Sequence, residues 1–199
     1  LDIGGLPEGN GYDYDYDARG NLIQITQLAK PNSGLPDRVV LKVGYPETCS
    51  NPITCNKPDW VQNAKGVAEG FRTDYTYDPT HGGVLTVTEP AQQNNIRPKT
   101  TYTYTPFDTG DGTIWRRTGS TLCASGSSCA GTADEVKEVI SYWNKTFLPE
   151  TKTKKAGDES VSSVESFVYN NAGHLIEATD PLNQKAYYFY DTVGQKIGE

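Results

Sequence analysis

The chain has 199 residues and a formal charge of −7 at pH 7, and its pI near 4.9 argues against the non-specific nucleic-acid binding that needs clustered Lys and Arg. Its mean hydropathy is −0.62, and no apolar run approaches the length of a membrane-spanning helix. With 20 Gly and 12 Pro to interrupt it, the chain is not expected to form long helices. It contains no Met, which predicts a processed or excised piece of a longer protein.

The first predicted element is a tyrosine-rich segment that ends in a turn. Residues 14–23 read Tyr-Asp-Tyr-Asp-Ala-Arg-Gly-Asn-Leu-Ile. Aromatic residues two apart share one face of a strand. Asp17 can accept hydrogen bonds from backbone amides ahead of it, and Gly20 can supply the positive φ that closes a hairpin. The segment therefore predicts two antiparallel strands joined by a tight turn.

Next along the chain comes the first of two matched cysteine pairs. Five residues separate Cys49 from Cys55, and five separate Cys123 from Cys129. An even number of cysteines at a repeated spacing favours two short-loop disulfides and an oxidising compartment. Free thiols, a metal site and pairing across the loops, such as Cys49 with Cys123, stay open as alternatives.

The tyrosine-and-turn pattern recurs. A variant over 75–85 has a turn two residues longer, and residues 102–104 begin a more degenerate copy. Two further copies near the C-terminal end are spaced by about 21 residues, and acidic-Pro pairs end the return strands. The positions that we expect to set the hairpins are Tyr14, Tyr16, Asp17, Gly20, Leu22, Tyr75, Tyr77, Asp78, Gly83, Tyr102, Tyr104, Tyr169, Gly173, Leu175, Asp180, Pro181, Tyr188, Tyr190, Asp191 and Gly194.

This recurring pattern, Tyr-x-Tyr-Asp-x-x-Gly-x-Leu followed by Asp-Pro-Leu, resembles the YD repeat of the RHS family. That family includes bacterial polymorphic toxins, the shell-forming subunits of Tc toxins and the teneurins. The copies are clear over 12–30, 58–105 and 164–199, whereas the cysteine-bearing stretches 46–58 and 106–163 are degenerate. The resemblance implies an all-β fold in which repeated antiparallel hairpins form a curved sheet, with residues 1–199 as a single segment of an RHS-type β-shell.

The same resemblance implies a structural function without catalysis. Such a segment would help to enclose a toxin passenger in a secreted or cell-surface bacterial protein, would have the flanking repeats of a longer chain as partners, and would need no cofactor. The alternative is a carbohydrate-binding or adhesion module that uses exposed tyrosines. Because the tyrosines occupy the repeated positions, we expect them mainly to stack on one another across strands.

Three other patterns have a chemical interpretation and a structural one. Residues 108–110 match the Asp-Thr-Gly tripeptide of aspartic proteases, but that chemistry needs a second carboxylate, and the following Asp-Gly favours a polar turn. The alternate acids Asp13, Asp15 and Asp17 could hold calcium, although solvated strand positions explain them better. His81 and His174 fall in predicted turns.

Residues 135–142 could form a helical turn or a strand. We expect a strand, because Val136, Glu138, Ile140 and Tyr142 would then share one face.

Overall fold

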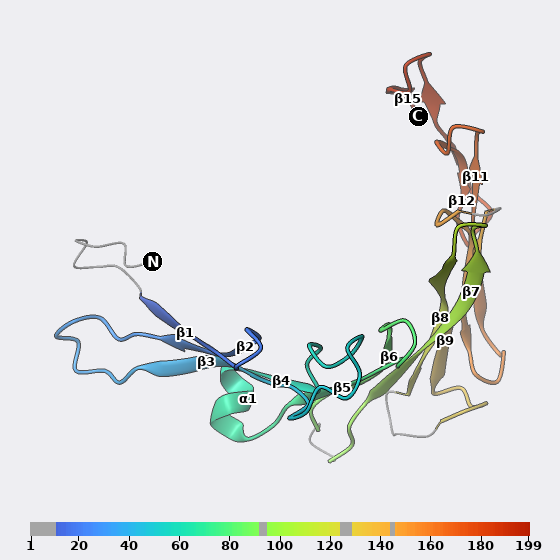
Figure 1. Cartoon of the computed structure of the whole chain (residues 1–199). Coiled ribbons are helices and arrows are strands. Elements are labelled where there is room, and N and C mark those ends of the chain that lie inside the picture. The colour runs from blue at the N-terminus through green and yellow to red at the C-terminus, as the bar shows by residue number, and fades with distance from the viewer. Residues whose placement is uncertain (1–10, 92–94, 124–128, 144–145) are drawn as a thin grey trace. The chain divides into compact units, whose positions relative to one another are not determined.

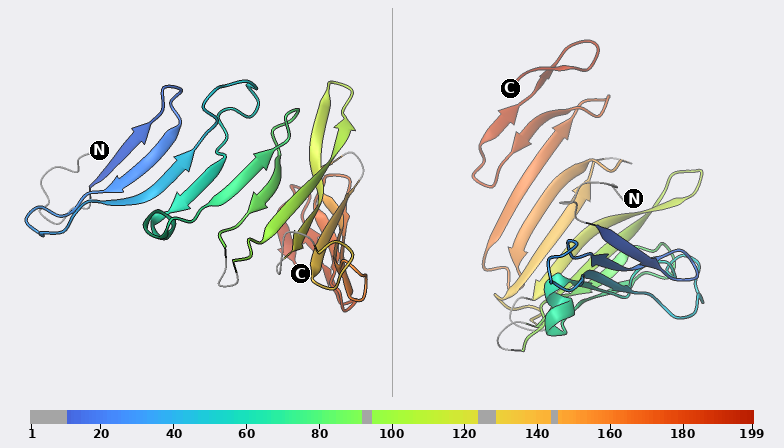
Figure 2. Two further views of the ribbon diagram at one scale, coloured as in Figure 1. Left: turned by 90° about the horizontal axis from the view of Figure 1, so that it is seen from below. Right: turned by 90° about the vertical axis from the view of Figure 1, so that its left-hand side faces the viewer.

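The structure is a computed structural model that describes residues 11–91, 95–123, 129–143 and 146–199. The chain divides into two compact units, Leu1–Arg97 and Pro98–Glu199. Both units are built almost entirely from antiparallel strands that follow one another in chain order (Figures 1 and 2). The all-β fold of repeated antiparallel hairpins that the sequence predicted is therefore confirmed.

The described residues of the first unit form six strands and a short helix. In both the chain and the sheet the order of the strands is β1 (Tyr12–Tyr16), β2 (Leu22–Gln27), β3 (Arg38–Gly44), β4 (Trp60–Asn63), β5 (Thr73–Tyr77) and β6 (Val84–Thr88). Helix α1 (Ala64–Glu69) connects β4 to β5. In the part of the chain that the structure describes, β1 pairs with β2 alone and is thus an edge strand.

The second unit follows the same plan, and its first five strands are longer than those of the first unit. Seven strands of this unit are neighbours in chain order: β7 (Lys99–Asp108), β8 (Thr113–Cys123), β9 (Glu135–Tyr142), β10 (Pro149–Ala156), β11 (Ser162–Tyr169), β12 (Leu175–Thr179) and β13 (Lys185–Tyr187). Strands β14 (Phe189–Tyr190) and β15 (Lys196–Gly198) form a separate hairpin. Strand β9 confirms the strand that we expected over 135–142.

Helix α1 is one element that the tyrosine pattern does not predict. It begins after Asn63, whose side chain accepts a hydrogen bond from the Gly66 amide, and it ends at Gly70 in the left-handed conformation. Both are ordinary capping residues, so the local signal for a one-turn helix is present in the sequence. The helix has only six residues, which is consistent with the expectation that long helices are absent from this glycine-rich chain.

Five hairpins carry a β-bulge at the second aromatic residue of the repeat. The strand register shifts next to Tyr16, Tyr77, Tyr104, Tyr169 and Tyr190. A bulge inserts an extra residue in one strand and increases the local right-handed twist. The repeated sequence therefore encodes a repeated distortion of the backbone as well as repeated hairpins.

The units contain very little buried side-chain volume. Among the described residues the buried hydrophobic side chains are those of Cys55, Cys129 and Ile140, and none of the large side chains is fully buried. Most strand residues are half-buried or exposed. A sheet of this kind obtains its stability from contacts between neighbouring strands, because no second layer covers most of its surface.

One such contact joins β3 to β4. Gly44 is opposite Trp60 in the register, and the indole lies so close to Gly44 that an added Cβ would overlap three of the ring atoms. The Arg72 guanidinium lies over the indole, with its central carbon 5.3 Å from the ring centre. Glycine at position 44 is thus required by the space that Trp60 occupies.

We expect Gly44→Ala to destabilise the first unit by about 1–3 kcal/mol, the usual cost of overpacking. Chemical denaturation would measure the change in the free energy of unfolding. Gly198→Ala is the matched control, since its new methyl group would meet Phe189 only at 3.5 Å or more. An equal effect of both substitutions would contradict the role of Trp60.

Candidate functional site

The tight turn after the second tyrosine is the most regular local structure in the chain. In the first hairpin, Asp17 Oδ1 accepts hydrogen bonds from the amides of Arg19 and Asn21, both at 2.9 Å. The Asp17 amide donates to the Asn21 carbonyl, and the Gly20 amide donates to the Asp17 carbonyl. Gly20 adopts a φ of 83°, which glycine reaches without steric cost. The side chain thus closes the turn from inside.

The same four hydrogen bonds recur at three other turns. Asn170 and Asp191 accept from the amides two and four residues ahead, with glycine in the left-handed position in both cases. Asp180 does the same between β12 and β13, where Asn183 takes the glycine position at a φ of 63°. The Asp-Pro pair that we expected to end a strand therefore also begins a turn of the YD type.

The turn of the third hairpin corrects one expectation. Its left-handed glycine is Gly82, with a φ of 71°, and not Gly83. The Asp78 amide donates to the Gly83 carbonyl, so the turn is one residue longer than that of the first hairpin and not two. Gly83 instead donates its amide to His81 Nδ1 at 3.0 Å, because the additional residue turns the imidazole back toward the loop.

The hydrogen bonds at the first turn stabilise the charged form of Asp17. A hydrogen bond from the Asn21 side chain and the amides of Asn21 and Arg19 lower the pKa of Asp17 from 3.8 to about 2. The Arg19 guanidinium lies 3.3 Å from Asp17 Oδ2. A depressed pKa in the folded state means that the carboxylate contributes stability above pH 4 and loses it as the pH falls toward 2.

We expect Asp17→Asn to remove this pH dependence and to keep the turn, since Asn170 forms the same turn in the second unit. The difference in unfolding free energy between the native chain and the variant should be constant above pH 5 and should change between pH 4 and pH 2. Urea unfolding at a series of pH values would measure it. A difference that stays flat to pH 2 would contradict the assignment.

In two repeats the second tyrosine forms a hydrogen bond to the element before its hairpin. Tyr77 donates its hydroxyl hydrogen bond to the Pro58 carbonyl at 2.9 Å, and Tyr169 donates to the Pro149 carbonyl at the same distance. Burial raises the pKa of Tyr77 to about 12, with a smaller effect from Tyr75, and burial also raises the pKa of Tyr169. These hydroxyls therefore act as hydrogen-bond donors between neighbouring elements.

Opposite the second tyrosine, the return strand of the hairpin supplies a side chain to pair with it. Leu22 pairs with Tyr16, and Leu175 pairs with Tyr169, as cross-strand partners. Lys196 takes the corresponding place opposite Tyr190. In these two hairpins with leucine, Leu22 and Leu175 thus form one half of the pair at the bulge.

Aromatic contacts occur both along one strand and between elements. Tyr75 stacks on Tyr77 along one strand, with ring centres 6.5 Å apart. Between elements, Trp143 lies against Tyr169 and His174 stacks on Tyr190. Tyr188, which lies between β13 and β14, and Tyr102 each carry a cation over the ring, from Lys196 and Arg117. Cations suit this position because they cover a half-buried ring and keep their charge in water.

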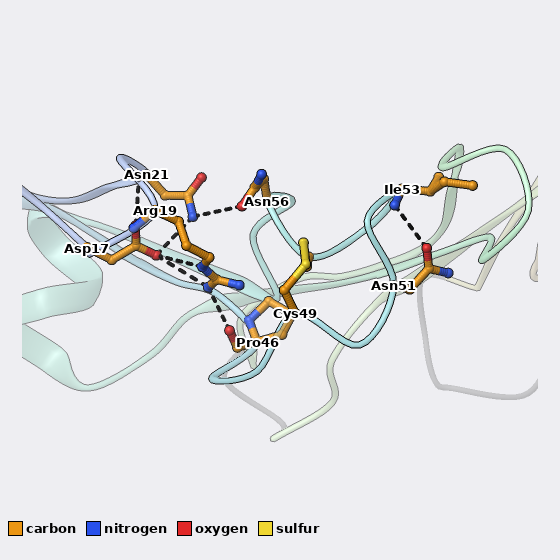
Figure 3. Close-up of a disulfide and its surroundings, with 9 residues drawn as sticks. Asp17, Arg19, Asn21, Pro46, Cys49, Asn51, Ile53 and Asn56 are labelled. Atoms are coloured by element: carbon orange, nitrogen blue, oxygen red, sulfur yellow. Dashed lines mark hydrogen bonds and ion pairs between the residues drawn. A yellow bond between two sulfur atoms is a disulfide. The ribbon is translucent and has the colours of Figure 1, made fainter.

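Both cysteine pairs form the short-loop disulfides that the spacing favoured, Cys49–Cys55 and Cys123–Cys129. The first of these disulfides closes a loop that reaches two turns (Figure 3). On one side Arg19 donates to the Pro46 carbonyl at 2.7 Å, and Asn21 donates to Asn56. On the other side Asn51 donates to the Pro79 carbonyl at 2.8 Å. The degenerate stretch 46–58 therefore links the first and third hairpins through hydrogen bonds.

Replacing both Cys49 and Cys55 by Ser should lower the free energy of unfolding by about 2 kcal/mol, the entropic contribution expected for so short a loop. Because the loop holds both turns, we also expect new protease cleavage within 46–58. Limited proteolysis with mass spectrometry would locate the sites. A matched variant with both Cys123 and Cys129 replaced should leave that loop uncut, and cleavage of 46–58 in this second variant would contradict a local effect.

Glu135 is a structural residue that the sequence analysis missed. Only 5% of its surface is exposed, and its carboxylate accepts a hydrogen bond from the Gly131 amide at 2.7 Å and lies 3.2 Å from Lys137 Nζ. The Gly131 hydrogen bond lowers the pKa of Glu135. An added Cβ on Gly157 would overlap the same carboxylate. The signal was weak because glutamate at the start of an amphipathic strand is normally a solvated residue.

The remaining candidates for chemistry have structural partners. Asp108 Oδ1 accepts from the Gly110 amide and Thr109 donates to the Gly112 carbonyl, so Asp-Thr-Gly forms the polar turn between β7 and β8. Asp15 accepts from Gln24. Among the described residues, no group of three or more His, Cys, Asp or Glu side chains is arranged to hold a metal ion.

A hollow of about 490 Å³ in the first unit lies beside Trp60 and Phe71. Its two arginines are held within the fold. Arg72 and Arg97 both form ion pairs with Asp74, at 2.7 and 2.6 Å. Arg97 also donates to the carbonyls of Arg72, Thr88 and Glu89. Arg72 and Arg97 therefore stabilise the ends of β5 and β6 through these ion pairs and hydrogen bonds.

No family model and no curated protein matches the sequence. Solved structures do match the fold. A crystal structure of TcdB2-TccC3-Cdc42 has 12% sequence identity and a TM-score of 0.57 over 93% of this chain. The Photorhabdus luminescens Tc holotoxin pore has 11% identity and a TM-score of 0.56 over 91% of this chain. TcdB2-TccC3 without its hypervariable C-terminal region has 12% identity and a TM-score of 0.57 over 94% of this chain.

The chain has an RHS/Tc-toxin-like fold. The RHS-type resemblance that the tyrosine repeats carried is thus confirmed at the level of the fold. The chain spans only 8–9% of the length of the chains that it matches. No helix among the described residues is both long enough and apolar enough to cross a membrane.

Proposed function

We propose that this chain is a non-catalytic wall segment of an RHS-type β-shell, in a secreted or cell-surface bacterial protein that encloses a toxin passenger. The observation that carries the proposal is the sheet with almost no buried core, in a chain whose fold matches Tc-toxin proteins over more than nine-tenths of its length. A wall has to separate two compartments and needs no interior of its own. Two disulfides support an oxidising environment.

The way in which the hairpins are joined supports the same function. Two hairpins are joined to the preceding element by a tyrosine hydroxyl, that of Tyr77 and that of Tyr169. This arrangement can be extended by adding hairpins without rebuilding a core, as in other repeat proteins. We propose residues 1–199 as one repeat segment of such a wall, with flanking repeats of a longer chain as its neighbours.

Electron microscopy of the full-length parent protein, combined with limited proteolysis, tests this proposal. We expect a closed hollow particle and a C-terminal passenger that resists protease until the particle is opened. An open or filamentous particle whose C-terminal region is digested at the rate of a free domain would contradict containment.

A second candidate function is carbohydrate binding by the edge strand. Tyr12, Tyr14 and Tyr16 alternate along β1 with exposures of 42, 50 and 58%, and exposed aromatic rings can stack on sugars. Glycan-array binding of the isolated chain that is lost in Tyr14→Ala and kept in Asp13→Ala would support this function. The absence of binding, or equal loss in both variants, would contradict it.

A further inference from the structure

The two disulfides of this chain differ in their access to solvent. In the first disulfide Cys49 is exposed, whereas only 4% of the surface of Cys55 is exposed. In the second disulfide Cys123 is half-buried and Cys129 is buried. Exchange with an external thiol requires that its sulfur reach one of the two bonded sulfurs. The first disulfide can therefore be approached from the side of Cys49, and the second has no exposed cysteine.

The strands around the second disulfide protect it further. Cys123 ends β8 and is the cross-strand partner of Lys99 in β7 and of Glu135 in β9. It thus has a neighbouring strand on each side. Cys49 lies between β3 and β4, outside any strand. Segments outside the strand ladders open more readily than paired strands, so access and local stability both make the first disulfide easier to reduce.

The hydrogen bonds that hold the stretch 46–58 are divided unequally between the two sides of the first disulfide. Residues 51–58 have three hydrogen bonds to the hairpins, at Asn51, Asn56 and Pro58. For residues 46–50 the structure describes one side-chain hydrogen bond to a hairpin, from the Arg19 guanidinium to the Pro46 carbonyl (Figure 3). The disulfide is therefore the main connection between residues 46–50 and the better-held residues 51–58.

The contact with Pro46 leads directly into the first turn. Arg19 lies 3.3 Å from Asp17 Oδ2, and its amide is one of the two that donate to Asp17 Oδ1. One other hydrogen bond, from Asn21 to Asn56 at 3.2 Å, joins this turn to the far side of the disulfide. A displacement of Pro46 would therefore remove one of the two connections between the first turn and the stretch 46–58.

We propose that the Cys49–Cys55 disulfide is a redox switch that small thiols of the glutathione class open. Its reduction would free residues 46–50 and loosen the first turn. The third hairpin would keep its contacts with residues 51–58, and Cys123–Cys129 would stay oxidised. The inference goes beyond the wall function, because it concerns how the first unit responds when it passes from an oxidising to a reducing compartment.

The chemical step is thiol–disulfide exchange. A thiolate attacks Cys49 Sγ, the bond between the two protein sulfurs breaks, and the electron pair leaves with Cys55 Sγ, which takes up a proton. A second thiolate attacks the external sulfur of the mixed disulfide and releases Cys49 as a thiolate, which is protonated in turn. Two external thiols are thereby oxidised to one disulfide, and the protein gains two thiols.

A time course of reduction in the native chain tests the proposal. The chain is incubated with excess reduced glutathione, samples are quenched by alkylation, and mass spectrometry of the peptides reports the state of each cysteine. We expect Cys49–Cys55 to be reduced at least about tenfold faster than Cys123–Cys129, because access to the sulfur governs the rate of exchange. Equal rates, or faster reduction of the second disulfide, would overturn the proposal.

Amide hydrogen exchange followed by NMR measures the consequence for the turns. After reduction the amides of Arg19 and Asn21 should exchange at least about tenfold faster, because local opening of the first turn becomes easier. The amides of Thr80 and His81, which donate to Asp78 in the third hairpin, should change by less than about twofold. A first turn whose exchange is unaffected by reduction would contradict the switch.

Two double variants are the matched controls. With Cys49→Ser and Cys55→Ser the first turn should exchange rapidly with or without glutathione. With Cys123→Ser and Cys129→Ser the chain should respond to glutathione as the native chain does. A response that survives in the first variant, or that is lost in the second, would overturn the assignment to Cys49–Cys55. A full-length particle without a passenger would leave all of these results unchanged, so failure of containment and failure of the switch are distinguishable.

Discussion

Lateral pairing between neighbouring strands is the interaction on which this structure depends. Almost no side chain is fully buried among the described residues, so the stability that a globular domain obtains from its core must come from elsewhere. Here it comes from the strand ladders, from the two tyrosine hydroxyls that donate to proline carbonyls, and from cations that cover half-buried rings. Each contribution is local, so adding a repeat adds its own stabilisation.

The turn shows how far the repeat is conserved within this one chain. Asp17, Asn170, Asp180 and Asp191 make the same bonds to the backbone, although the intervening residues differ. Asn183 replaces glycine at one of the four turns, which is possible because Asn tolerates the left-handed conformation better than most residues. The turn therefore requires a particular backbone geometry and one side-chain oxygen. The residues at its other positions can vary and can contact neighbouring elements.

The irregular stretches reinforce the places where the repeat is interrupted. The stretch 46–58 is held to the first turn by hydrogen bonds from Arg19 and Asn21 (Figure 3). It is held to a second turn by the hydrogen bond from Asn51 to the Pro79 carbonyl. In the second unit Glu135 fills the space that Gly157 leaves and binds the Gly131 amide. Interruptions of the pattern thus do not weaken the sheet, because each brings a covalent or charged connection that a plain hairpin does not have.

The sequence by itself determined the hairpins, their turns, the disulfide spacing and the RHS-type fold, because all of these depend on residues close together in the chain. The pattern of tyrosine, aspartate and a later glycine, as in Tyr16, Asp17 and Gly20, specifies a turn through local hydrogen bonds and backbone geometry. Only the tertiary structure decided which neighbours the side chains meet: that Tyr77 reaches Pro58, that Trp60 excludes a side chain at position 44, and that Gly82 takes the left-handed place. These contacts depend on strand register and on bulges, and a shift of one residue would exchange the two faces of a strand.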